Sequence, residues 1–313
     1  MRVTTKMLTS SLLNNVNNNL NQLQKYENQL SSKVKVDKIS DDPVAAAKIL
    51  KAKSELKSQE QYSTNMEYAS GWLRSVDDAL ASVDDVLQRA RGIAVRGSNG
   101  ATSIESSKAL GEEVNSIIGE LVHIANTDYN GSYIFAGGGS STVPFTTIPE
   151  DGANITEVNF ITSDAATLQE TFSQKVEISK GVTIDLSAGQ MAFHTDGSGV
   201  TDINSTFKTL NELRENLVNG NQQSVNDLIG EIDKLIDNVI SERAVAGAKS
   251  NRIEQAQGRS ESFNNSLNTL VSNLEDTDYA ETSALFSSQQ AVYEASLTVG
   301  AKIIQPSLLD FLK

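Results

Sequence analysis

Two pairs of adjacent aspartates are the first candidates for chemistry in this sequence. Asp77-Asp78 and Asp84-Asp85 lie seven residues apart within a stretch of helical periodicity, so that both pairs share one face of a helix. Carboxylates grouped in this way could bind a divalent cation. They also lie beside apolar core positions, where a charged, solvated helix face is the more common use of such a pattern. We therefore expect no metal site here.

The remaining candidates for catalysis or ligand binding are few. Gly137-Gly138-Gly139 lacks the following Lys-Ser/Thr of a phosphate-binding loop and is better read as a flexible connection. The two histidines, His123 and His194, supply neither a His-Glu-x-x-His zinc motif nor a Ser/His/Asp set, and there is no cysteine. We expect no catalytic residue, no metal and no cofactor, and hence no enzyme.

Composition excludes several classes of partner. The chain has 313 residues and a formal net charge of −14, without a basic block that could contact nucleic-acid phosphates. No run approaches the ~20 apolar residues of a membrane span, and no cleaved secretory signal is recognisable at the start. The absence of cysteine excludes a disulfide scaffold. We expect a protein that binds neither nucleic acid nor membrane.

Long helices form the predicted framework. Asp42 as N-cap and Pro43 at the first helical position predict a helix start. From there to about Arg96 the apolar residues alternate at spacings of four and three: Tyr62, Met66, Ala69, Leu73, Val76, Leu80, Val83, Leu87, Ala90 and Ala94. A helix of ~50 residues would be ~75 Å long, longer than a compact domain, so the sequence predicts an elongated antiparallel rod of long helices.

A β-rich insert interrupts the helices. From about residue 131 to 200 short runs of alternating polarity replace the helical period, and Tyr133–Phe135 is expected to be a strand. Val176 and Ile178, then Val182 and Ile184, alternate with polar residues around a Gly181 turn, which predicts a hairpin. Helical spacing returns after about residue 203 and is broken at 219–221.

Both ends of the chain carry apolar stripes of helical spacing. The predicted seam residues are Leu13, Val16, Leu20, Leu23, Leu30 and Val34 in the first arm and Leu285, Val292, Val299 and Ile303 in the last. Residues 1–36 have a net charge of +4 and residues 275–313 a net charge of −4, so the arms attract each other. We expect the arms to stay disordered until assembly, because the first arm's own seam is too small to offset the cost of ordering it. The alternative is an ordinary coiled coil within one chain.

Four motifs resemble the flagellin superfamily, particularly its hook-filament junction branch. Leu30–Ser32 with Ser40–Ala47 resembles the N-terminal signature, and Asn126–Gly137 resembles the segment that leads into the outer domain. Arg243–Arg252 resembles the return helix and Ala291–Leu312 the C-terminal end. Lys33 stands where the family commonly has glycine, which leaves the turn there in question.

The resemblance, together with the periodicity, gives a domain plan. It consists of an N-terminal polymerisation arm, the first half of a helical rod, a variable β-rich outer domain, a returning rod helix and a C-terminal polymerisation arm. The boundaries that we expect are 1–36, 37–130, 131–200, 201–262 and 263–313.

The resemblance also implies a function. It implies a structural adaptor of the bacterial flagellum, exported without signal cleavage to an extracellular position, that forms a ring between hook and filament. The implied partners are further copies of itself, the other hook-filament junction protein, flagellin, and an export chaperone on the C-terminal arm. A short flagellin that forms the filament itself is the alternative within the family; an enzyme or a coiled-coil adhesin is the alternative outside it.

Overall fold

The computed structural model describes residues 5–99, 103–136, 142–149, 155–160, 174–187, 189–193 and 205–309, with only the backbone given at 5, 6, 190, 191 and 303–309. Gly137–Gly139 and His194 lie outside the described residues. The chain divides into two compact units. We call Met1–Gln59 with Glu261–Lys313 the terminal unit, and Glu60–Ser260 the central unit.

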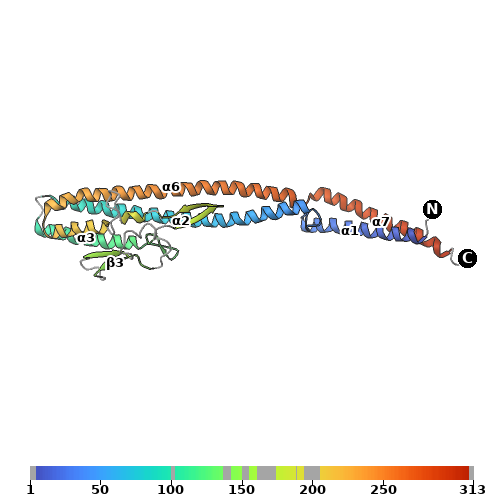
Figure 1. The fold of residues 1–313 in the computed structure, drawn as a ribbon, viewed down its shortest axis with the longest axis horizontal. Helices are drawn as coiled ribbons and strands as arrows, with labels where there is room; N and C mark the ends of the chain where they lie inside the picture. Colours follow the sequence, from blue (N-terminus) through green and yellow to red (C-terminus); the bar gives the residue numbers. More distant parts are fainter. Residues whose placement is uncertain are drawn as a thin grey trace. The chain divides into compact units, whose positions relative to one another are not determined.

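The structure is mainly helical (77%) with a small β region, which confirms the predicted fold class (Figure 1). The described helices are α1 (Thr5–Ser32), α2 (Pro43–Gly97), α3 (Ile104–Ala125), α5 (Ser205–Val218), α6 (Gln222–Glu275), α7 (Tyr279–Leu309) and a short 3-10 helix, η1 (Gln190–Phe193). The described strands are β1 (Asp128–Tyr129), β2 (Ser132–Tyr133), β3 (Phe145–Ile148), β4 (Glu157–Phe160), β5 (Lys175–Ser179) and β6 (Val182–Asp185).

The apolar residues at spacings of four and three that were predicted for α2 lie at the centre of the core of the central unit. Nine of these ten residues, Met66 to Ala94, are buried, and Tyr62 packs against them half-buried. They share one apolar cluster with residues of α3, α5 and α6, among them Ile118, Leu121, Leu210, Ile232 and Val239. The spacing of apolar residues in the sequence thus correctly predicted which face of α2 is buried.

Side chains cap the helices where the sequence breaks the helical period. Asp42 Oδ1 accepts hydrogen bonds from the backbone N–H groups of Val44 and Ala45 at 3.0 and 2.9 Å, immediately before Pro43 begins α2. Asp278 Oδ1 does the same at α7 for Ala280 and Glu281, at 2.9 and 3.1 Å. Each aspartate therefore satisfies backbone donors that the helix leaves free.

The β region consists of three antiparallel pairs, β1–β2, β3–β4 and β5–β6. The β5–β6 hairpin turns at Gly181 (φ +72°), as predicted. The strand expected at Tyr133–Phe135 is wrong beyond Tyr133. Asn130 and Gly131 (φ +55° and +80°) make the two-residue turn that joins β1 to β2. β2 ends at Tyr133, and the next residues, Ile134 and Phe135, are buried in the core.

Aromatic side chains join this β region to the helices. Phe145, Phe193 and Phe207 pack in one group with ring centroids 5.4–5.7 Å apart, and Phe135 and Phe160 contact it. The described strands therefore share the apolar core of the central unit.

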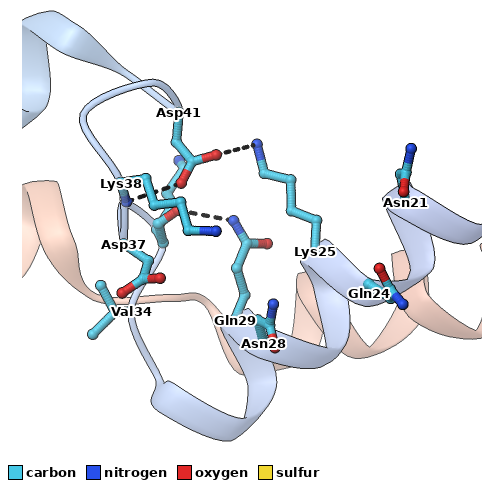
Figure 2. Close-up of a pocket in the computed structure, with 10 residues that line it drawn as sticks. Asn21, Gln24, Lys25, Asn28, Gln29, Val34, Asp37, Lys38 and Asp41 are labelled. Atoms are coloured by element: carbon cyan, nitrogen blue, oxygen red, sulfur yellow. Dashed lines mark hydrogen bonds and ion pairs between the residues drawn. The ribbon is translucent and has the colours of Figure 1, made fainter. Parts of the chain in front are cut away.

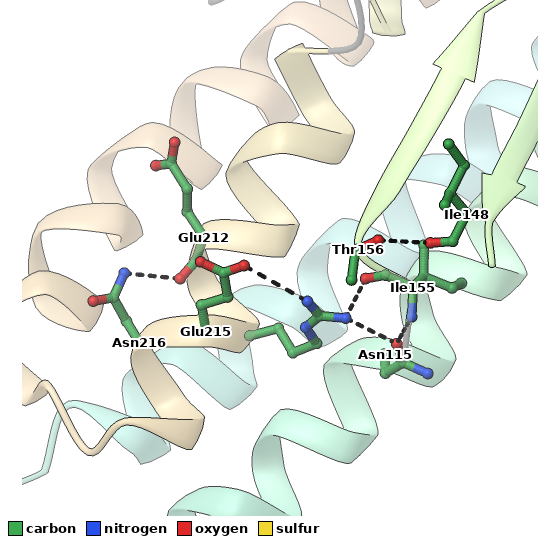
Figure 3. Close-up of polar contacts among 8 residues, drawn as sticks. Asn115, Ile148, Ile155, Thr156, Glu212, Glu215 and Asn216 are labelled. Atoms are coloured by element: carbon green, nitrogen blue, oxygen red, sulfur yellow. Dashed lines mark hydrogen bonds and ion pairs between the residues drawn. The ribbon is translucent and has the colours of Figure 1, made fainter. Parts of the chain in front are cut away.

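A buried arginine fixes the segment before β4 to the helices. Arg214 of α5 donates through Nη1 to the carbonyl oxygen of Ile155 and to Asn115 Oδ1 of α3 (3.3 Å for the latter), and its Nη2 lies 3.8 Å from Glu215 Oε1. Asn115 Oδ1 also accepts from the Ile155 N–H at 2.8 Å (Figure 3). Only 10% of the Arg214 side chain is exposed, so these contacts form in a partly desolvated site.

The terminal unit contains an antiparallel pair of helices, α1 and α7, with the start of α1 and the end of α7 at the same end of the pair (Figure 1). The link after α1 is hydrogen-bonded to the residues before α7: Lys35 N donates to the Glu275 carbonyl at 2.6 Å and Thr277 N to the Lys33 carbonyl at 3.0 Å. Lys33 adopts φ +61°. The turn that the sequence left in question is therefore present, with lysine in a conformation that favours glycine.

We predict that Lys33→Gly raises the free energy of unfolding of the terminal unit by about 1 kcal/mol, because a left-handed conformation costs a side chain roughly that much. The measurement is urea unfolding of the full chain followed by circular dichroism. Lys35→Gly is the matched control, since Lys35 has no positive φ and glycine there should lower stability. Equal stability of Lys33→Gly and wild type would contradict the prediction.

We predict that Arg214→Met lowers the free energy of unfolding of the central unit by about 1–3 kcal/mol, because the Ile155 carbonyl loses its charged donor in a buried site. The same unfolding experiment measures the loss. Lys234→Met is the control: Lys234 makes an exposed ion pair with Glu231 at 2.9 Å, and its loss should cost less than about 0.5 kcal/mol. If the two variants lose equal stability, Arg214 does not fix this segment.

Candidate assembly surface

The face of α7 that packs on α1 is largely polar or small. Its covered or half-covered residues recur at spacings of four and three: Thr282, Phe286, Gln289, Tyr293, Ser296 and Gly300. Gly300 allows close approach, because a Cβ atom there would lie 2.9 Å from Leu12 Cδ2. Among the described side chains of α1 and α7, no large hydrophobic residue is fully buried.

The α1 seam that the sequence predicted is partly covered within the same chain. Val16, Leu20, Leu23 and Leu30 of α1 are half-buried, as is Val34, which bridges to Asp276 after the helix ends. Leu13, in contrast, is 56% exposed, and its neighbour Leu12 takes the position against α7. Near the start of α1, the face that α7 covers is therefore shifted by one residue from the predicted seam.

The described residues of the α7 seam lie beside the face that packs on α1. Leu285, Val292 and Val299, which we call the α7 stripe, are 42%, 45% and 52% exposed. They precede Phe286, Tyr293 and Gly300 by one residue each, and so lie about 100° round the helix from them. Within one chain these three residues are therefore not the ones that α1 covers; that the two seams meet in an assembly stays a prediction. Ile303 lies in α7, but its side chain is not among those described.

The exposed residues of the two helices flank the α1–α7 pair on opposite sides. We call the exposed Leu13 and the half-buried Leu20 the α1 stripe. When α1 is viewed from its N-terminus, both lie clockwise of the positions that face α7. When α7 is viewed from its own N-terminus, the α7 stripe lies anticlockwise of the face that meets α1. Because α1 and α7 are antiparallel, the two stripes lie on opposite flanks of the helix pair.

Further exposed apolar residues lie in the terminal unit. They are Met7 and Leu8 on α1, Val44 and Leu50 on α2, Phe263 and Leu270 on α6, and Leu297 on α7. We did not predict Phe263 and Leu50 from the sequence, although the seven-residue spacing of Phe263 and Leu270 was a usable signal. The terminal unit thus exposes apolar residues on every helix that contributes to it.

A polar hollow beside α1 has a structural role. Lys25 Nζ lies 3.4 Å from Asp41 Oδ1, Lys38 N donates to Asp41 Oδ2 at 3.1 Å, and Gln29 Nε2 donates to the Lys35 carbonyl at 2.9 Å (Figure 2). The backbone N–H of Lys38, and after it the Lys25 ammonium, hold the pKa of the Asp41 carboxyl below its ordinary value. These contacts fasten the 33–42 link to α1.

The aspartate pairs of α2 stand on the surface of the central unit. Asp77 Oδ1 accepts from Arg243 Nε of α6 at 3.1 Å, while Asp78 and Asp85 are exposed. Within the part of the chain that the structure describes, no group of three or more His, Cys, Asp or Glu residues could hold a metal ion. His123 is exposed on the last turn of α3. Among the described residues, no helix has the length and apolar character needed to cross a membrane.

Comparison with known proteins places these features in a family. The bacterial flagellin N-terminal helical region matches residues 3–140, and the bacterial flagellin C-terminal helical region matches residues 229–312. Flagellar hook-associated protein 3 of Escherichia coli (strain K12) is 24% identical over 313 residues, with 95% of each chain covered. The flagellin of Listeria monocytogenes is 26% identical over 314 residues, covering 100% of this chain and 99% of that flagellin.

A solved structure agrees on the fold. The flagellar junction protein FlgL from Legionella pneumophila superposes with a TM-score of 0.56 at 16% sequence identity, over 73% of this chain and 100% of that one. Since the N- and C-terminal flagellin regions together match most of the chain and occupy its two ends, the chain belongs to the flagellin superfamily.

Proposed function

We propose that this chain is a structural adaptor of the bacterial flagellum, without enzymatic activity, that joins the hook to the flagellin filament. The observation that carries the proposal is the position of two apolar stripes on opposite flanks of the α1–α7 pair. All three residues of the α7 stripe are exposed, and in the α1 stripe Leu13 is exposed and Leu20 half-buried. A surface of this kind, in a chain of the flagellin superfamily, is suited to be covered by neighbouring subunits.

The stripes favour association in a ring. Because they differ in sequence and lie on opposite flanks, the α7 stripe of one copy can meet the α1 stripe of the next, which is a head-to-tail contact. The opposite charges of the arms, +4 for residues 1–36 and −4 for residues 275–313, favour the same contact. A head-to-tail contact closes into a ring or continues as a helix, depending on its rotation.

The junction role is preferred to that of a filament subunit on the motifs. Asp42-Pro43 and the Asn126–Gly137 segment resemble the junction branch, and proteins named for that role match the chain over most of its length. A short flagellin is the second candidate, favoured by the full-length match to the Listeria flagellin.

The proposed partners follow from the junction role. They are further copies of the chain, the other hook-filament junction protein on the hook side and flagellin on the filament side. An export chaperone would cover residues 263–313 before assembly, since the α7 stripe is an aggregation hazard while it is uncovered. The chain would act outside the cell, after export without signal cleavage, and neighbouring subunits would cover its arms on assembly.

We predict that purified chain added to sheared filament seeds does not extend them, whereas flagellin of the same bacterium does. Electron microscopy of the seeds measures the difference. A gene deletion supplies the second readout: hooks remain intact, motility is lost and flagellin is shed into the medium. Long filaments made of the purified chain would select the flagellin alternative instead.

We predict that the triple substitution Leu285→Ser, Val292→Ser, Val299→Ser abolishes complementation of the deletion strain while the central unit keeps its thermal transition. The stripe residues belong to the terminal unit, so their loss should remove the assembly surface and leave the core of the central unit unchanged. Swimming motility and calorimetry are the two measurements.

The matched control replaces exposed polar residues of the same helix by alanine, at Ser287, Ser288 and Thr298. This variant should restore motility. The role of the stripe is disproved if the serine variant of the stripe swims as well as this control.

A further inference from the structure

A stripe of buried apolar residues on α6 is interrupted by two charged ones. Five residues stand at intervals of seven on this helix and so share one stripe: Leu228, Leu235, Glu242, Lys249 and Ala256. The two leucines and the alanine are buried members of the core, whereas Glu242 and Lys249 are half-buried. Charged side chains that are withdrawn from water need hydrogen-bond partners, so the partners of Glu242 and Lys249 indicate what these residues do.

Both charged residues bond to the backbone of one segment that follows β6. We call this segment, Leu186, Ser187 and Gly189–Phe193, the strap. Gly189 N donates to Glu242 Oε2 at 2.7 Å, and Lys249 Nζ donates to the Ser187 carbonyl oxygen at 2.7 Å. Since Ser187 is bonded at position 249 of α6 and Gly189 at position 242, the strap runs antiparallel to the helix at this point.

The strap is built into the core of the central unit. Three of its side chains are fully buried: Leu186, Ala192 and Phe193. Gly189 is also buried and has φ +83°, and a Cβ atom there would lie 2.9–3.1 Å from side-chain atoms of Phe135, Val76 and Leu80. A residue with a side chain therefore does not fit at position 189 without displacing its neighbours.

We propose that Glu242 and Lys249 form a latch that holds the strap by its backbone and so fastens the end of the β region to α6. An extended segment carries N–H and C=O groups that it cannot satisfy by itself, and a carboxylate and an ammonium are their matching partners. Because neither bond uses a side chain of the strap, the latch requires glycine at 189 and no particular side chain at 187. It lies within the central unit and does not depend on the proposed function.

Thiol labelling of the full chain tests the latch, since the sequence has no native cysteine. Ala192→Cys reports opening of the strap, and Ala125→Cys on α3 reports opening of the core as a whole, because both alanines are fully buried. Each reporter is placed in three backgrounds: wild type, Glu242→Ala with Lys249→Ala, and Glu231→Ala with Lys234→Ala. The last background is the matched control, which removes an exposed ion pair of the same helix.

Loss of the latch should raise the labelling rate of Ala192→Cys by at least about tenfold and leave that of Ala125→Cys unchanged. Tenfold is the factor expected when two hydrogen bonds to charged, half-buried groups are removed. The control background should change neither rate.

Single substitutions separate the backbone contacts from side-chain contacts. Glu242→Gln keeps an oxygen acceptor for the Gly189 N–H and should raise the labelling rate of Ala192→Cys less than Glu242→Ala does. Gly189→Ala should raise the rate, because the added Cβ atom displaces the strap. Ser187→Ala should leave it unchanged, because the carbonyl oxygen that Lys249 binds is retained.

An unchanged labelling rate of Ala192→Cys in the chain without the latch overturns the proposal. Equal increases at both reporters also overturn it, because the core as a whole would then have been destabilised. A rise with Ser187→Ala as large as the rise without the latch contradicts it as well, since the strap would then be held by a side chain.

Discussion

Apolar burial in this protein is concentrated in one of its two compact units. This unequal burial determines which unit is stable by itself and which one exposes an apolar surface. The central unit places residues of α2, α3, α5, α6 and the strands in one continuous core. The terminal unit buries Ile49, Gln59 and small residues of α2 such as Ala45, Ala46 and Ala52, while its other large apolar side chains stay half-buried or exposed. Since apolar burial is the main favourable term in folding, the central unit is complete by itself and the terminal unit is stabilised less.

A helix pair with uncovered stripes on both flanks is suited to a chain that must join others like it. Two different flanks allow each copy to have a neighbour on either side, which a symmetric dimer contact would not. On α7 the three stripe residues, Leu285, Val292 and Val299, stay exposed beside the face that packs on α1. The terminal unit thus keeps an apolar surface that a second molecule can cover.

The sequence predicted the fold best where one helix face is buried along most of its length. The spacing from Met66 to Ala94 identified the buried face of α2, and Asp42-Pro43 located its start, because a repeating apolar period and a cap are local signals. The β5–β6 hairpin was predicted for the same reason. Phe145 and Phe160 were not assigned to strands, since β3 and β4 are short and their pairing is decided by contact with the helical core.

The candidate site was predicted only in part, and the reason lies in α7. Leu285, Val292 and Val299 are the obvious seam by period, yet the face used within the chain contains Gln289, Ser296 and Gly300. Periodicity identifies apolar stripes but does not tell which of two adjacent faces a partner helix takes, here the one on which Gly300 lets Leu12 approach closely. The same limit explains why Leu13 was predicted in place of Leu12.

Thiol labelling of Val292→Cys, before and after assembly onto hooks, measures most directly whether neighbouring molecules cover the outward face of α7. The account predicts fast labelling of the free chain and protection of at least about tenfold in the assembled junction, as burial of a half-exposed side chain requires. Val182→Cys on the β5–β6 hairpin of the central unit should keep its reactivity in both states and serves as the control. Equal labelling of Val292→Cys in the free and assembled states would contradict the account.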